Sequence, residues 1–228
     1  KTGATSTKRF LFQLEFGHPL TVSLRLDTDM NSDPAPHFLK NAGVFRPVLW
    51  LPNGLQVLER ALRVTTARHP TTRALSSFTY LCRSDEDAHP WLADERMRMN
   101  AMTGIDWKTE RHSPTGFLKF LDYLAIEAEA DRLRMGDPHL RPQVLNVRPG
   151  VLRPDLVGRT ERLETFFRAL AERLERPLPE GWEMPHSNRQ DNATAETLLT
   201  PAAMGRLAQV FAADYEWLDE APDSWRHA

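Results

Sequence analysis

The fold is decided by the stretch Leu62-Arg-Val-Thr-Thr-Ala-Arg-His-Pro-Thr-Thr-Arg-Ala-Leu-Ser-Ser-Phe78. It begins with a short β-branched run, is interrupted by His69-Pro70, and continues with apolar residues at helical spacing. Pro70 suits the first position of a helix, where its missing N–H costs nothing. We therefore predict a strand, a tight turn and a helix. This prediction places Arg68 at the carboxyl end of the strand and Ser76 one to two turns into the helix.

Arg68 and Ser76 are candidates for binding a phosphate. Open α/β sheets bind ligands in the crevice beside the carboxyl ends of their strands, so both residues would lie at such a crevice. A guanidinium can donate two parallel hydrogen bonds to a phosphate, and a hydroxyl can add a third. Taken alone, an arginine in a surface ion pair and a serine in the first turns of a helix are commoner.

A second candidate anion-binding segment opens the chain, with the sequence Lys1-Thr-Gly-Ala-Thr-Ser-Thr7 leading directly into a helical pattern. A loop of small residues that enters a helix directs backbone N–H groups and the positive end of the helix dipole at an anion. The hydroxyl groups of this segment and the cation of Lys1 add donors. Two phosphate-binding segments in one α/β chain predict a ligand with two phosphate ends.

These motifs resemble those of the sulfotransferases. The run Lys1–Ser6 is similar to their 5′-phosphosulfate loop, and residues 68–76 are similar to their 3′-phosphate motif, Arg-Asp/His-Pro, two variable residues, Arg, two variable residues and Ser. Three further segments are similar to the carbohydrate sulfotransferases of sulfotransferase family 2: Asp137–Gln143, Val157–Glu164 and Leu199–Glu216.

The resemblance implies an α/β fold with a P-loop-like parallel sheet flanked by helices on both faces, the sulfotransferase fold. Because the chain starts at the lysine of the loop, the usual first strand is expected to be missing, either trimmed away or absent from the sheet. The implied reaction moves a sulfuryl group in line from 3′-phosphoadenosine 5′-phosphosulfate (PAPS) to a hydroxyl, of a sugar or glycan, with no metal expected.

The same resemblance implies roles for individual residues. It assigns the 5′-phosphate to Thr2, Gly3, Ala4, Thr5, Ser6 and Thr7, together with Lys1, and the 3′-phosphate to Arg68 and Ser76. In the family the lysine neutralises charge on the leaving oxygen, so Lys1 is the first catalytic candidate. Arg73, the second arginine of the motif, is expected to form a structural pair.

An acceptor hydroxyl must lose its proton during transfer, and a histidine or glutamate near the end of the second strand usually accepts it in this family. By position His37 is the best match, followed by His18 and Asp29. His139 is equally well explained by a structural role. No histidine spacing in the sequence resembles a metal-binding motif.

Two other functions stay open at this point. A P-loop nucleotide kinase or related phosphotransferase would need Mg²⁺ and prefer ATP, but the opening run lacks the pattern Gly-x-x-x-x-Gly-Lys-Ser/Thr. A degenerate, non-catalytic sulfotransferase-like module would bind a nucleotide or a partner.

The composition is that of a globular protein, and residues 1–228 are expected to form a single domain. The charge-rich residues 83–113 form either a lid over an acceptor site or loosely packed surface helices. The net charge of −2 gives no reason to expect nucleic acid or a membrane surface as a partner. No run of about 18 apolar residues or signal-peptide pattern occurs. A cytoplasmic location is expected, or the Golgi lumen if an anchor has been removed.

Periodicity also predicts elements outside the opening stretch. The predicted helices cover about 6–15, 55–61, 114–135, 163–174 and 201–211, and the predicted strands cover 20–26, 44–51, 143–147 and about 156–157. Ser113-Pro114 and Thr200-Pro201 each have the pattern of an N-cap followed by a proline in the first turn, which marks the start of a helix. The single cysteine, Cys82, lies on the apolar face of the helix that follows Pro70 and is expected to be part of the core.

Overall fold

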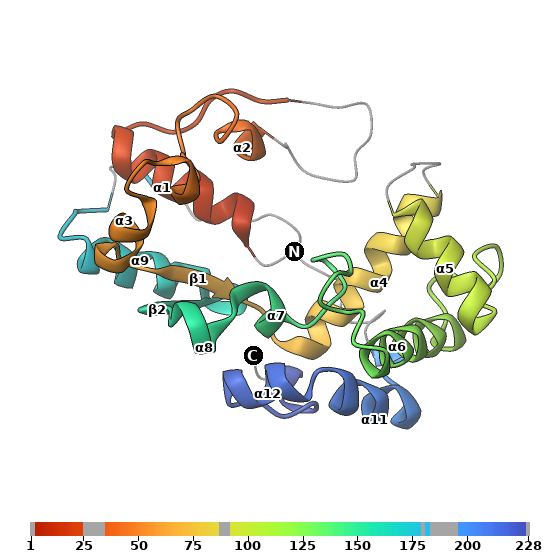
Figure 1. Ribbon diagram of the computed structural model, residues 1–228. Helices are drawn as coiled ribbons and strands as arrows, with labels where there is room; N and C mark the ends of the chain where they lie inside the picture. The colour runs from red at the N-terminus through yellow and green to blue at the C-terminus, as the bar shows by residue number, and fades with distance from the viewer. Residues whose placement is uncertain (1–2, 25–34, 87–91, 179–180, 183–195, 227–228) are drawn as a thin grey trace. The chain divides into compact units, whose positions relative to one another are not determined.

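The computed structural model describes residues 3–24, 35–86, 92–178, 181–182 and 196–226 (Figure 1). The chain divides into two compact units. Residues 2–67 and 149–188 form one of them, called the sheet unit below, and residues 68–148 and 189–228 form the other, called the helical unit. Each unit has a hydrophobic core of its own.

The described residues of the sheet unit form helices and two strands. Its elements are α1 (Ala4–Phe16), α2 (Ala35–Phe38), η1 (Val48–Trp50), α3 (Gly54–Arg60), β1 (Val64–Ala67), α8 (Pro149–Leu152), β2 (Leu156–Arg159), η2 (Thr160–Arg162) and α9 (Leu163–Arg173). The helices predicted over about 6–15, 55–61 and 163–174 are thereby confirmed, as is the strand that precedes Arg68.

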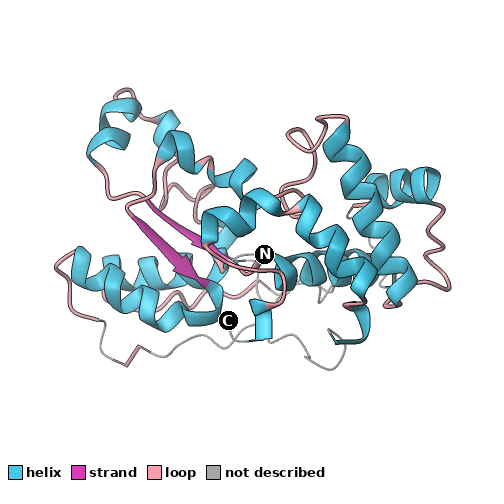
Figure 2. Ribbon diagram, turned by 90° about the horizontal axis from the view of Figure 1, so that it is seen from below, coloured by secondary structure: helices cyan, strands magenta, loops and turns pink. Residues whose placement is uncertain are grey.

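Strands β1 and β2 pair in parallel, with Val64 opposite Leu156 and Ala67 opposite Arg159 (Figure 2). The predicted fold class, α/β with a parallel sheet flanked by helices, is confirmed. At the start of the pair the Arg63 guanidinium donates to both carboxylate oxygens of Asp155, at 3.0 and 3.1 Å. These bonds lower the pKa of Asp155 to about 2.

Helices α1 and α9 supply most of the core of the sheet unit. The ring of Phe10 stacks on Phe167 with centroids 4.4 Å apart, and both side chains are almost fully buried. The ring of Phe166 lies so close to Gly158 in β2 that a Cβ there would be 2.3 Å from the ring. Only glycine therefore lets α9 approach the sheet this closely.

We expect Gly158→Ala to destabilise the protein, because a methyl group would overlap the ring of Phe166 and force helix and strand apart. The loss should be about 1 to 3 kcal/mol in the free energy of unfolding, measured by urea denaturation. Gly150→Ala in α8 is the matched control, since no atom lies within 4 Å of its added Cβ. Equal midpoints for the two variants would contradict the close approach.

The helical unit contains no strand among its described residues. Its elements are α4 (Pro70–Glu86), α5 (Ala93–Thr103), α6 (Pro114–Glu129), α7 (Gln143–Val147), α11 (Pro201–Val210), α12 (Ala212–Leu218) and η3 (Ser224–Arg226). Helices α4, α5 and α11 each contact α6 (Figure 1).

Helix α4 confirms the reading of the opening stretch, since it starts at Pro70 and buries the predicted apolar face. Phe78 and Cys82 are fully buried, and the Phe78 ring lies 5.5 Å from that of Phe117. The start signals of two other helices are also confirmed. Ser113 and Thr200 each accept a backbone N–H in the first turn, and a proline follows each of them.

Three predicted strands are wrong in the described residues. Residues 20–24 form no strand, and residues 44–51 contain the 3₁₀ helix η1. Residues 143–147 form helix α7. Periodicity cannot separate such short apolar runs from a buried helical turn, and long-range contacts then decide between them.

The single domain and the lid proposed for 83–113 stay predictions. Within that range α4 extends to Glu86 and α5 occupies Ala93–Thr103. Met99 and Ile105 are fully buried in the core of the helical unit. The part that the structure describes therefore packs on its unit.

Candidate functional site

The predicted 3′-phosphate motif begins with a turn capped by a buried histidine. His69 is fully buried, and its Nδ1 accepts a hydrogen bond of 3.3 Å from the backbone N–H of Thr71 in the first turn of α4. The ring thus replaces the usual capping oxygen. An accepting Nδ1 places the proton on Nε2, which lies 3.1 Å from the carbonyl oxygen of Ala221.

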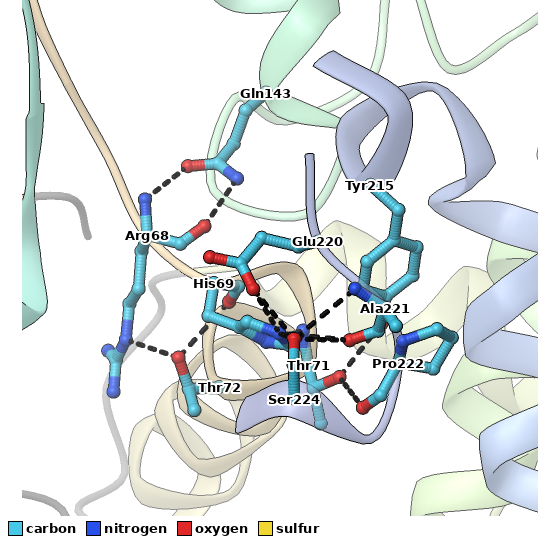
Figure 3. Close-up of polar contacts among 10 residues, drawn as sticks. All are labelled: Arg68, His69, Thr71, Thr72, Gln143, Tyr215, Glu220, Ala221, Pro222 and Ser224. Carbon is cyan, nitrogen blue, oxygen red and sulfur yellow. Dashed lines mark hydrogen bonds and ion pairs between the residues drawn. The ribbon is translucent and has the colours of Figure 1, made fainter. Parts of the chain in front are cut away.

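A segment near the end of the chain contacts this turn (Figure 3). The Thr71 hydroxyl donates to the carbonyl oxygen of Pro222 at 2.9 Å and lies 2.8 Å from the hydroxyl of Tyr215. Nε2 of His69 lies 3.0 Å from the Ser224 hydroxyl. We call Tyr215 and residues 220–224 the C-terminal clasp. The start of α4 is therefore fixed by residues more than 140 positions away.

Arg68 is held at its backbone and at its side chain. Its backbone N–H donates to Oε1 of Gln143 at 2.9 Å, and its carbonyl oxygen accepts from Nε2 of Gln143 at 2.8 Å (Figure 3). Its Nε donates to the Thr72 hydroxyl at 3.1 Å. Ser76 lies one turn further along the same face of α4. The Thr72 hydroxyl accepts from Arg68 and donates to the His69 carbonyl oxygen at 3.1 Å, so it orients the guanidinium. The Arg68 guanidinium and the Ser76 hydroxyl share this half-buried face and are donors that suit a phosphate.

A second, buried arginine, Arg73, adds positive charge to this region. Arg73 is 2% exposed and donates to the carbonyl oxygen of Pro138 at 2.8 Å. Burial lowers its pKa to about 10, with Asp214 acting against this shift and the cations of Arg68 and Arg141 adding to it. Arg73 stays charged at neutral pH. Besides its predicted structural role, its positive charge creates an electrostatic potential that favours an anion.

Asp214 is the buried acid of this region. It is fully buried, and its carboxylate oxygens accept the backbone N–H groups of Gln143 and Val144, each at 2.8 Å. Burial raises its pKa, and these two hydrogen bonds together with the charge of Arg73 oppose the rise. Burial also raises the pKa of the neighbouring Tyr215 to about 12, which keeps its hydroxyl protonated.

The described part of the predicted 5′-phosphosulfate loop, from Gly3 onward, belongs to the sheet unit. Lys1 and Thr2 lie outside the described residues. Gly3 precedes α1 with a φ of 68°, in the left-handed region that glycine favours, and it has no side chain to cap the helix. Thr7 donates both its N–H and its hydroxyl to the Gly3 carbonyl, at 2.9 and 3.0 Å. The first turn of α1, with Ala4, Thr5 and Ser6, therefore starts without a side-chain cap.

The structure brings one of the candidate bases to this loop. Nε2 of His37 in α2 lies 3.4 Å from the hydroxyl of Thr5, and the imidazole is exposed. His18 follows the other end of α1, roughly 20 Å away along a 13-residue helix, where its ring packs on Phe12. Asp29 lies outside the described residues. His37 and the loop are thus neighbours, and His18 is not.

Three contributors to the arginine site escaped the sequence analysis. Thr72 could have been found, because it stands four residues before Ser76 and thus on the same helical face. Gln143 and Tyr215 carry no local signal, since their roles come from contacts with residues 75 and 144 positions away. Nδ1 of His139, the other histidine considered, lies 2.7 Å from a carboxylate oxygen of Asp137.

The parallel sheet, the helix that follows Gly3 and the arginine–hydroxyl face are the features expected of a sulfotransferase. The model of the sulfotransferase family matches residues 1–219, and the chain therefore belongs to this family, in the family 2 group that its motifs resemble. No curated protein and no solved structure is significantly similar to the chain. The loop and the arginine face lie in different units, so their binding to one nucleotide stays a prediction.

Two further observations concern the described residues alone. No group of three or more histidine, cysteine, aspartate or glutamate side chains in them is arranged to hold a metal ion. No helix in them combines the length and apolar character that a membrane span requires.

We expect Thr71→Val to destabilise the protein by about 1 to 3 kcal/mol, because it leaves the buried Tyr215 hydroxyl and the Pro222 carbonyl without their shared partner. Thr115→Val is the matched control. It makes the same change at the second position of α6, where the threonine is exposed. Urea denaturation measures both, and similar losses would show that the C-terminal clasp adds nothing to stability.

Proposed function

We propose that this sulfotransferase transfers the sulfuryl group of PAPS to a hydroxyl of a sugar or glycan. Arg68 and Ser76 bind the 3′-phosphate of the donor, and residues 1–7 bind its 5′-phosphosulfate. His37 accepts the proton of the attacking hydroxyl.

The arrangement around Arg68 is the observation that carries this proposal. PAPS differs from a 5′-nucleotide by its 3′-phosphate, so a PAPS enzyme needs a dedicated site for that group. The Arg68 guanidinium lies against Thr72 with Ser76 one turn beyond, and Arg73 beneath adds positive charge. A guanidinium two residues before α4 and a hydroxyl in the second turn of that helix suit a phosphate dianion.

The start of α1 supports the second half of the proposal. Small residues and a left-handed Gly3 lead into a 13-residue helix whose first turn has no side-chain cap. The N–H groups of that turn, together with the helix dipole, favour an anion. The chain's place in the sulfotransferase family makes a phosphosulfate the anion expected there.

The proposed reaction is an in-line displacement at sulfur. The acceptor oxygen forms a bond to sulfur while the bond from sulfur to the bridging oxygen breaks, and 3′,5′-bisphosphoadenosine leaves. Lys1 neutralises the charge on the leaving oxygen, and the acceptor proton goes to Nε2 of His37. The 3.4 Å between Nε2 and the Thr5 hydroxyl supports this role, because it puts the imidazole beside the loop. A carbohydrate acceptor rests on the resemblance of the family 2 motifs.

We expect the chain to bind 3′,5′-bisphosphoadenosine far more tightly than AMP, without added metal, in isothermal titration calorimetry. Arg68→Ala should reduce the first affinity by about 10- to 100-fold, the range of a lost charge-assisted hydrogen bond, and leave AMP binding unchanged. Thr5→Ala is the complementary variant, and it should weaken both ligands by the same factor.

Two results would contradict the proposed donor. Equal affinity for AMP and the bisphosphate in the unaltered chain would remove the 3′-phosphate site. Tighter binding of ATP with Mg²⁺ than of the bisphosphate would favour a phosphotransferase.

We expect His37→Ala to abolish sulfuryl transfer while leaving the affinity for 3′,5′-bisphosphoadenosine intact, because the imidazole takes the proton and does not hold the donor. Transfer is measured with radiolabelled PAPS and a panel of sugars, lipids and small alcohols, which also identifies the acceptor. His18→Ala is the comparison. A loss of transfer in that variant, with an active His37→Ala, would reassign the base.

A further inference from the structure

The side-chain amide of Gln143 forms a closed pair of hydrogen bonds with the backbone of Arg68. Its oxygen accepts the Arg68 N–H at 2.9 Å, and its nitrogen donates to the Arg68 carbonyl at 2.8 Å (Figure 3). Gln143 is 3% exposed, so water does not compete for these bonds. The amide therefore pairs with both the backbone N–H and the carbonyl oxygen of Arg68, as a residue of a neighbouring strand does in a β-sheet.

Arg68 needs such a partner because of its place in the chain. Strand β1 ends at Ala67 and helix α4 begins at Pro70, so neither element satisfies the N–H and carbonyl groups of Arg68. Buried or half-buried backbone polar groups require partners. Gln143 supplies both, and this fixes the direction in which the arginine side chain leaves the backbone.

Gln143 is itself held in place. Its backbone N–H and that of Val144 donate to the two oxygens of Asp214, each at 2.8 Å, and Asp214 is fully buried. The preceding residue is Pro142, which has no N–H, so the carboxylate of Asp214 completes the start of α7. The backbone of Gln143 is thus held by Asp214, and this positions its side-chain amide against Arg68.

We propose that Gln143 is a positioning residue for the 3′-phosphate, acting through the backbone of Arg68, with Asp214 as its support. This inference rests on the proposed function, in which Arg68 binds that phosphate. Gln143 itself touches neither donor nor acceptor. Its effect is confined to ligands that carry a 3′-phosphate, because Arg68 is the group it orients.

The test is the ratio of the affinities for 3′,5′-bisphosphoadenosine and AMP, measured by calorimetry on the full chain. Gln143→Met keeps the length of the side chain and removes its two hydrogen bonds to Arg68, together with the 3.5 Å bond of the amide to Asp214. We expect it to lower the affinity for the bisphosphate about tenfold and to leave AMP binding unchanged. Asn146→Leu is the control on the same helix, because it removes the bonds of Asn146 to the Pro138 carbonyl and to Arg141 and leaves the bonds between Gln143 and Arg68 in place. It should leave the ratio unchanged.

A double-mutant cycle separates positioning from a general structural role. In the Arg68→Ala background Gln143→Met should leave the ratio as it is, because the group that the amide orients is gone. If Gln143→Met fails to fold, Gln143→Leu replaces it, since it removes both bonds to Arg68 and adds no charge beside Asp214 or the proposed phosphate site. It should also lower the ratio.

The outcomes distinguish this inference from the function on which it rests. If the unaltered chain prefers the bisphosphate and the Gln143 variants keep that preference, the positioning role is overturned and the proposed donor stands. If the unaltered chain shows no preference, both are overturned. A fall in the affinity for both ligands by the same factor also overturns the positioning role.

Discussion

The arginine site depends on two hydrogen bonds between the amide of Gln143 and the backbone of Arg68. A residue between a strand and a helix has no regular backbone hydrogen-bond partner, so its side chain can adopt many directions. The Gln143 amide restricts the backbone of Arg68, and Asp214 restricts the backbone of Gln143. The Thr72 hydroxyl accepts a hydrogen bond from the Arg68 guanidinium and so helps to fix its direction without a ligand. Such preorganisation favours tight recognition of an anion.

The strand–turn–helix that contains this site could be predicted because its signals are local. A β-branched run, a proline at the first helical position and apolar residues at helical spacing all lie within residues 62–78, and each favours the same structure. The prolines after Ser113 and Thr200 marked helix starts for the same reason. Arg68 and Ser76 were identified as candidates from their spacing and from the resemblance to the sulfotransferase motif.

The wrong and missed predictions have the opposite cause, because contacts between residues far apart in the sequence decide them. Residues 143–147 form a short apolar run whose pattern suits either a strand or a helix. Asp214, about 70 positions away, favours the helix because it accepts the first two backbone N–H groups. Gln143 therefore appeared as the first residue of a strand, although its amide holds the arginine. In the sequence His69 indicated only that it fills the Asp/His position of the motif. Its burial and its cap on the N–H of Thr71 depend on residues such as Ala221, more than 140 positions away.

The C-terminal clasp also sets when the turn can form during synthesis. Thr71 and its partner Tyr215 are separated by 144 residues, and the ribosome adds about 5 to 20 residues per second, so the turn waits roughly 7 to 29 s for that partner. His69 waits slightly longer for Ser224. A chain that stops before Tyr215 lacks these contacts. The turn is therefore completed only after the residues of the clasp have been synthesised.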